Sequence, residues 1–180
     1  DRQRLILADS LVMSGRLYNA GAWSALTDSE AKLVHGETMK VYRAAAKVSF
    51  TEATSCVTDA QVLADLQRAP PVLLLRVARL RLFGALLQTG PKLVFALIRA
   101  EWTEAARHHN GRARTWLGML LDDMAWLRTA SLRCGELPDP RESIEPWEDL
   151  ARRSSAGWKR ILGQALHAAA QAHMRNAQAT

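Results

Sequence analysis

Two helix-capping signals constrain the fold of this chain more than any other feature. Thr27-Asp28-Ser29-Glu30 and Thr58-Asp59-Ala60-Gln61 each place a threonine three residues before a glutamate or glutamine. In such a capping box the threonine hydroxyl and the later side chain bond each other's free backbone amides at a helix start. The sequence therefore predicts one helix that begins near Thr27 and fades near Lys47, and a short helix that stops before Pro70.

Apolar residues at spacings of three and four predict helices in most of the remaining chain. A first helix should end near Arg16, and Pro71 suits the first turn of a helix that runs to Gly90, because a proline there loses no hydrogen bond. Further helices are expected from Pro91 to about Ala106, and from Trp116 onward. No alternation typical of strands stands out, and residues 48–50 are the place where a short strand would fit. We predict an all-α fold, a helical bundle of about six or seven helices with short loops.

Composition divides the chain into three expected parts. Residues 1–134 form a helical domain, and residues 135–153 form an acidic linker that contains Pro138, Pro140 and Pro146. Residues 154–180 are basic, free of acids and rich in alanine, so we expect a fraying helix or a disordered tail.

Length and cysteine content exclude several classes of protein. A chain of 180 residues can bury a core without a disulfide or a structural metal. Cys56 and Cys134 have no cysteine or histidine at zinc-ligand spacing, so we expect reduced thiols, an intracellular location with the nucleus as one option, and no cofactor. The apolar stretch near Val94 to Ile98 is far shorter than the ~20 residues that cross a bilayer, so no membrane partner is expected. The start at Asp1, without a methionine, suggests a piece of a longer chain.

Positive charge is concentrated in the middle of the chain. The net charge is +6, and the segment from Arg68 to Arg114 holds nine Lys or Arg and two acids. The hexapeptide Arg79-Leu80-Arg81-Leu82-Phe83-Gly84 lies within it, on an apolar helical period. A helix with an arginine-rich face favours an acidic partner, most commonly nucleic-acid phosphate.

We therefore expect a continuous cationic ridge, and the alternative is a solvated polar surface. The candidate phosphate-binding residues are Arg76, Arg79, Arg81, Lys92, Arg99, Arg112 and Arg114.

Groups that could support catalysis have simpler structural interpretations. Asp122-Asp123 resembles the adjacent metal-binding aspartates of polymerases, but in a helical pattern their carboxylates point about 100° apart. We expect both to face solvent, with Leu120, Leu121 and Met124 inward. His108-His109 has no neighbouring carboxylate or cysteine and is expected in a solvated loop. Cys56 shows no base beside it.

Tryptophan is frequent, and its positions within helical patterns favour anchoring roles in the core. Trp102 and Trp158, each near basic residues, are the two candidates for stacking on nucleic-acid bases. The six tryptophans are Trp23, Trp102, Trp116, Trp126, Trp147 and Trp158.

Several motifs follow one another in order over roughly residues 1–130. They are Tyr18-Asn19-Ala20-Gly21-Ala22-Trp23, the segment from Thr27 to Glu37 with Tyr42-Arg43, Arg79-Leu80-Arg81-Leu82-Phe83-Gly84 with Pro91, Trp116-Leu117, and Asp123-Met124-Ala125-Trp126-Leu127. As an ordered set they resemble the region downstream of the polymerase core in non-LTR (LINE-type) retrotransposon endonuclease–reverse transcriptase polyproteins. Leu82, Ala85, Ala20 and Ala22 depart from the family pattern, and a cysteine-rich zinc knuckle is absent.

The resemblance implies a thumb or linker segment that packs against the template–primer duplex and holds its phosphates. Its partners would be RNA or DNA and the chain's own upstream polymerase core. The catalytic aspartates of that family would lie upstream, so the resemblance implies no enzymatic activity here. The alternative is a helical protein-interaction module, or a decayed orphan reading frame.

Overall fold

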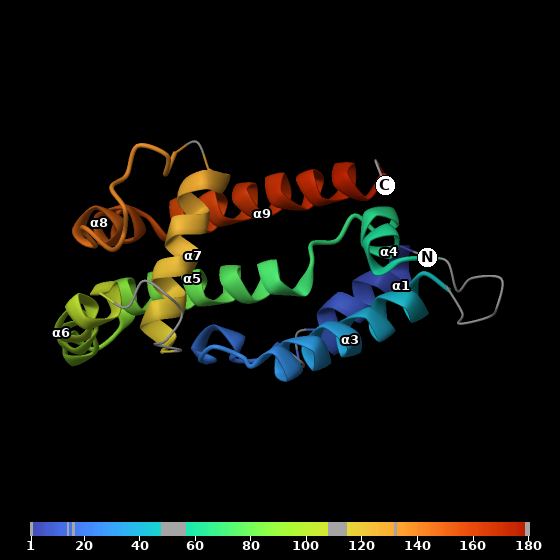
Figure 1. The fold of residues 1–180 in the computed structure, drawn as a ribbon, viewed down its shortest axis with the longest axis horizontal. Coiled ribbons are helices and arrows are strands. Elements are labelled where there is room, and N and C mark those ends of the chain that lie inside the picture. Colours follow the sequence, from blue (N-terminus) through green and yellow to red (C-terminus); the bar gives the residue numbers. More distant parts are fainter. Residues whose placement is uncertain are drawn as a thin grey trace. The chain divides into compact units, whose positions relative to one another are not determined.

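The computed structural model of the chain describes residues 2–13, 15, 17–47, 57–107, 115–131 and 133–178. In these residues all regular structure is helical, with eight α-helices where about six or seven were expected (Figure 1). The prediction of an all-α helical bundle is therefore confirmed. The possible strand at residues 48–50 and the helix end near Arg16 lie outside the described residues.

Ten helical elements follow one another along the described chain. They are α1 (Arg2–Leu7), the π-helix η1 (Ala8–Met13), the 3-10 turn η2 (Ala20–Ala22), α3 (Asp28–Ala45), α4 (Asp59–Asp65), α5 (Pro71–Thr89), α6 (Lys92–Arg107), α7 (Trp116–Ala130), α8 (Glu145–Arg153) and α9 (Ser155–Gln178).

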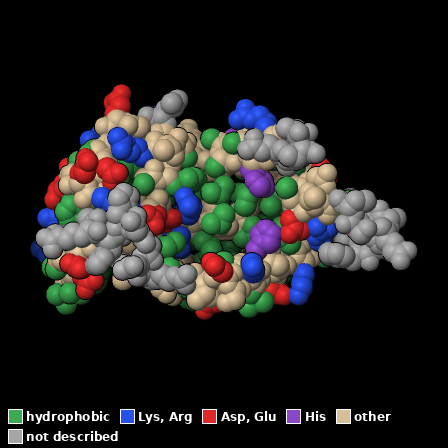
Figure 2. Space-filling view, viewed as in Figure 1, with side chains coloured by type: hydrophobic (Ala, Val, Ile, Leu, Met, Phe, Trp, Pro, Cys, Tyr) green, Lys and Arg blue, Asp and Glu red, His purple; other side chains and the backbone are tan. Residues whose placement is uncertain are grey.

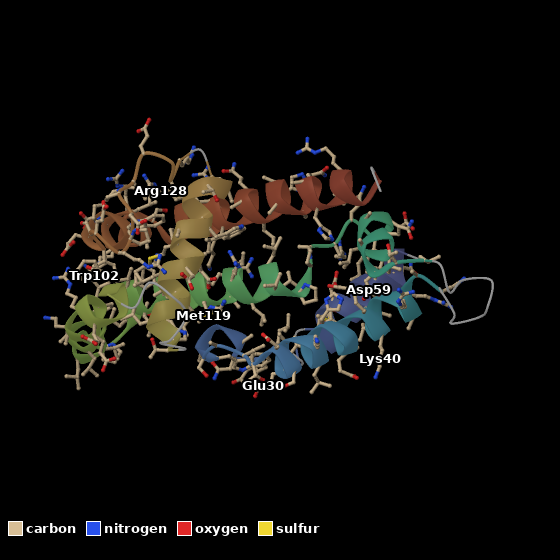
Figure 3. The ribbon with its side chains drawn as sticks, viewed as in Figure 1. Glu30, Lys40, Asp59, Trp102, Met119 and Arg128 are labelled. Atoms are coloured by element: carbon tan, nitrogen blue, oxygen red, sulfur yellow. The ribbon has the colours of Figure 1, made fainter. Side chains whose placement is uncertain are left out.

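Both predicted capping boxes are present and begin α3 and α4. The amide of Thr27 donates to the carboxylate of Glu30 across 2.7 Å, and the Thr27 hydroxyl accepts the Glu30 amide. Glu30 is labelled at this end of α3 in Figure 3. Thr58 and Gln61 repeat the arrangement, with the Thr58 amide 2.8 Å from Gln61 Oε1. These side chains satisfy donors that a helix start otherwise leaves without a partner.

The chain packs as two compact units, of which the first comprises Asp1–Tyr18, Thr27–Leu74 and His167–Thr180. Within it α1 and α3 lie side by side (Figure 1). Asp59, labelled in Figure 3, accepts hydrogen bonds from Arg43 and lies 2.9 Å from His35 Nε2. Burial alone would raise the pKa of Asp59, but the hydrogen bonds from Arg43 and His35 hold it below its usual value. The small apolar core of this unit contains Met13, Met39, Tyr42, Val62 and Leu63.

The second unit comprises Asn19–Leu26 and Leu75–Leu166 and has the larger core. Residues of α5, α6, α7, α8 and α9 all contribute to this core. Its largest fully buried side chains include Trp147, Phe83, Leu80, Leu120 and Leu162.

The expected division at residues 134 and 153 does not describe this packing. The segment predicted to be a linker contains α8, in which Pro146 occupies the first turn beside Glu145 and Trp147 is fully buried. The segment expected to be either a fraying helix or a disordered tail forms the helix α9, and Trp158 and Leu162 from its first half lie in the same core as Phe83. Because these residues come from all three expected parts, the described residues between 75 and 166 pack around one core.

No helix in the described part of the chain combines the length and the apolar character that crossing a membrane requires.

Candidate functional site

Arg79, the centre of the expected cationic ridge, is buried in the second unit. Its side chain is 4% exposed, and its Nε donates to Oδ2 of Asp123 across 2.6 Å. A second hydrogen bond joins Nη2 to Oδ1 of the same carboxylate across 3.2 Å. The expectation that Arg79 contacts a phosphate is corrected by this geometry, because its charge is already paired inside the core.

Two further candidate arginines also face acids. Arg76 Nε lies 3.7 Å from Asp123 Oδ1, and its guanidinium stacks over Trp126 at 5.8 Å from the ring centroid. Arg99 Nη2 donates to Oε2 of the buried Glu148 across 2.6 Å. These pairs hold each arginine in place and lower the positive charge available to an outside ligand.

The expected continuous ridge is absent from the described residues. On the face shown in Figure 2, Lys and Arg side chains are interspersed with Asp and Glu side chains. Arg81 and Lys92 are exposed, and within the described ranges no acid pairs with either of them. Arg112 and Arg114 lie outside the described residues.

A groove of about 480 Å³ lies between α5 and α9 in the second unit and contains two basic residues. Arg81 enters it from α5, and Lys159 enters it from α9. Hydroxyl groups of Thr89 and Ser155 add donors and acceptors beside the two cations. The complete lining is Arg81, Leu82, Gly84, Ala85, Gln88, Thr89, Ser155, Trp158 and Lys159.

Close packing of α5 on α9 forms the floor of this groove. Trp158 donates its indole N–H to the backbone oxygen of Leu80 across 2.9 Å. A Cβ added at Gly84 would lie 2.4 Å from Cδ1 and Nε1 of Trp158, so only glycine lets the indole approach this closely. The glycine of the Arg79–Gly84 motif therefore serves helix packing, and the exposed face around Arg81 is left as a wall of the groove.

The two helices that form the groove carry no acid anywhere in their sequences. From Leu150 to Thr180 the chain contains five Lys or Arg residues and no Asp or Glu. Within the described part of the chain, neither Arg81 nor Lys159 has an ion-pair partner. Two cations without ion-pair partners, on helices that contain no acid, give the groove a positive charge that favours binding of an anionic group.

Most of the tryptophans are anchors, as the sequence predicted. Four indole N–H groups donate to backbone oxygens: Trp102 to Pro140, Trp116 to Gly21, Trp147 to Pro138 and Trp158 to Leu80. Trp158 is buried, so it has no open face for a base to stack on. Trp102, labelled on α6 in Figure 3, is partly buried against the core.

Of the two adjacent aspartates of α7, one faces solvent and the other is buried in the core. Asp122 is exposed and accepts a hydrogen bond from Arg141, which agrees with the expectation for this residue. Asp123 is 1% exposed, so the expectation that it faces solvent was wrong. Leu120, Leu121 and Met124 are buried as predicted, and Asp123 shares their face because Arg79 compensates its charge.

The remaining candidate groups form no reactive site in the described residues. Cys134 is a buried free thiol whose pKa is raised by burial. Cys56, His108 and His109 lie outside the described residues. In the part of the chain that the structure describes, no three His, Cys, Asp or Glu residues are placed to hold a metal ion.

An apolar groove of about 300 Å³ lies elsewhere in the second unit, between α5, α6 and the start of α7. Leu97 of α6, which lines this groove, is 57% exposed, and Leu93, one turn earlier on the same helix, is 70% exposed. The groove is lined by Ala22, Leu82, Leu86, Val94, Leu97, Ile98 and Trp116.

The comparisons with known proteins leave the family of this chain open. No protein-family model, curated protein or solved structure matches it. Function is therefore inferred from the geometry of the chain itself.

Sequence reasoning missed Lys159 and Ser155 as members of the site. The acid-free basic segment after Leu150 is visible in the sequence, but its composition alone leaves a fraying helix and a disordered tail both open. The signal that could have found them is the helical spacing of the apolar residues Trp158, Ile161, Leu162 and Ala165, which predicts a packed helix face.

Proposed function

We propose that this chain is a non-catalytic, helical nucleic-acid-binding segment that holds phosphates in the groove between α5 and α9. The observation that carries the proposal is the placement of Arg81 and Lys159 on two acid-free helices that share one groove. Guanidinium and ammonium groups bind phosphate oxygens strongly, and they do so without reference to base sequence. Backbone binding of this kind needs no cofactor and no reacting group.

The proposal assigns the earlier candidates to different roles. Arg81 and Lys159 contact phosphate, and the exposed Lys92 adds long-range attraction. Arg76, Arg79 and Arg99 stabilise the core of the second unit through Asp123 and Glu148.

The motif resemblance gives the proposal its biological setting. The segment would belong to a LINE-type reverse transcriptase, downstream of the polymerase core, and would contact the template–primer duplex. The groove wall contains three residues of the Arg79–Gly84 motif, Arg81, Leu82 and Gly84, together with the adjacent Ala85. This setting remains a proposal that rests on the motifs.

Binding to a fluorescently labelled RNA–DNA hybrid tests the proposal. The Arg81→Gln/Lys159→Gln double variant should bind at least about tenfold more weakly than the natural chain, because it loses two charge-assisted contacts. The matched control is Lys40→Gln/Arg133→Gln, which removes the same charge from exposed positions outside the groove. Equal losses in the two double variants would reject a specific role for the groove.

The alternative function is a helical protein-interaction module, and the apolar groove lined by the exposed Leu97 favours it. Exposed apolar surface next to a hollow is typical of sites that receive another protein. Leu97→Glu should then abolish a self-association or partner complex that light scattering detects. Hybrid binding that survives Leu97→Glu and fails in Arg81→Gln/Lys159→Gln would favour the nucleic-acid function.

A further inference from the structure

The two serines between α8 and α9 differ in what their hydroxyl groups do. Ser154 Oγ accepts the amide of Gly157 across 3.0 Å and so caps the start of α9. Ser155 is exposed, lines the α5–α9 groove, and has no hydrogen bond from its hydroxyl in the described structure. Ser155 is therefore free to react where Ser154 is engaged.

Two exposed arginines precede this serine. Arg152 and Arg153 stand three and two residues before Ser155. Charge patterns around a serine decide which protein kinases accept it, and two arginines at these positions suit a kinase that selects basic substrates.

We propose that Ser155 is a phosphorylation site, and that its phosphate occupies the groove between Arg81 and Lys159. This inference rests on the proposed function, because the same two cations would hold the nucleic-acid phosphate. The modification would then act as a switch that closes the groove to nucleic acid.

The chemistry is phosphoryl transfer from a nucleoside triphosphate bound to a protein kinase. The Ser155 oxygen forms a bond to the γ-phosphorus as the bond from that phosphorus to the β–γ bridging oxygen breaks. A nucleoside diphosphate leaves, and the serine proton passes to the kinase's catalytic carboxylate.

Three features of the second unit would stabilise the product. Ser155 is the first residue of α9, where the helix dipole favours negative charge. Lys159 follows four residues later on the same helix face, within reach of the phosphate. Arg81 lines the opposite wall. A dianionic phosphate would offset both cations, so the groove would lose its attraction for other phosphates.

The first test locates the modification. The full chain is incubated with ATP and a purified serine kinase that selects arginines before its target, and phosphorylated peptides are mapped by mass spectrometry. One phosphoryl group is expected on Ser155, lost in Ser155→Ala and retained in Ser154→Ala. No incorporation, or incorporation that persists in Ser155→Ala, would overturn the assignment.

The second test asks whether the phosphate occupies the groove, and it needs no nucleic acid. Phosphoserine is installed at position 155 by genetic code expansion, and its second ionisation is followed by phosphorus NMR. Its pKa should lie about half a unit or more below the value in the Arg81→Gln/Lys159→Gln background. Equal values in the two proteins would overturn the contact.

The two proposals fail in different ways. If the phosphoserine responds to Arg81 and Lys159 while the unmodified chain does not bind hybrid, the proposed function is lost and the phosphate contact stands. If the unmodified chain binds hybrid and phosphorylation leaves its affinity unchanged, the switch is wrong. The expected result is a loss of affinity as large as that of the double variant.

Discussion

Arg79 of α5 and Asp123 of α7 form a two-point ion pair inside the second unit, with Arg79 Nε 2.6 Å from Asp123 Oδ2 and Nη2 3.2 Å from Oδ1. The two side chains are 4% and 1% exposed. Burial raises the pKa of Asp123, and the hydrogen bonds and charge of Arg79 oppose that rise. Each residue is tolerated in the core only because the other is present.

Replacing either member of this ion pair should destabilise the folded protein. Arg79→Met and Asp123→Leu should each lower the free energy of unfolding by about 3–5 kcal/mol, because each leaves a buried charge without its partner. The double variant should lose much less than the sum of the two. Urea denaturation of all four proteins measures the coupling.

Arg76 provides the control for this double-mutant cycle, because its Nε lies 3.7 Å from Asp123 Oδ1 and its side chain is partly exposed. Arg76→Met should cost less than Arg79→Met. Additive losses for Arg79→Met and Asp123→Leu would contradict a buried, interdependent pair.

A side chain at Gly84 should destabilise the folded protein. A Cβ there would lie 2.4 Å from the Trp158 indole, which is itself held by the Leu80 oxygen. We expect Gly84→Ala to lower the free energy of unfolding by about 1–3 kcal/mol through overpacking. A Cβ added at Gly163 of α9 would meet no atom within 4 Å, so Gly163→Ala should raise stability by about 0.5–1 kcal/mol. Thermal unfolding of both variants checks this, and equal effects would refute the close crossing of α5 and α9.

Tyr42 in the first unit should ionise only at high pH. Burial, followed by the nearby charge of Asp9, raises its pKa to about 12. Because the folded pKa exceeds the unfolded value of about 10, the associated stability is present below about pH 10 and is lost as pH rises through about 12. The tyrosinate absorbance of a Tyr18→Phe protein reports Tyr42 alone.

The partner of Tyr42 supplies the control for this titration. Its hydroxyl donates to Asp9 Oδ1, so Asp9→Asn should lower the pKa of Tyr42. An unchanged titration in Asp9→Asn would show that Asp9 has no influence on the phenol.

Local features of the fold could be predicted from the sequence because their causes lie within one helical turn. The boxes at Thr27 and Thr58 each involve partners three residues apart, and Pro71 begins α5 as its missing amide suggests. The α8 helix was missed, although a proline in its first turn beside Glu145 and Glu148 is a recognised helix start.

The candidate site could be predicted only in part, because its geometry depends on distant residues. Asp123 is buried on account of Arg79, which lies 44 positions earlier in the chain. Lys159 lines the same groove as Arg81 because the packing of Trp158 on Gly84 brings α9 against α5 there. Charge counts along a sequence cannot distinguish an arginine that neutralises a core acid from one that faces a ligand.

The salt dependence of hybrid binding tests the central claim most directly. If Arg81 and Lys159 each neutralise one phosphate, the slope of log affinity against log salt should be steeper in the natural chain than in Arg81→Gln/Lys159→Gln by about 1.8. The control Lys40→Gln/Arg133→Gln should keep the natural slope. Identical slopes in the natural chain and the groove variant would contradict phosphate binding in the α5–α9 groove.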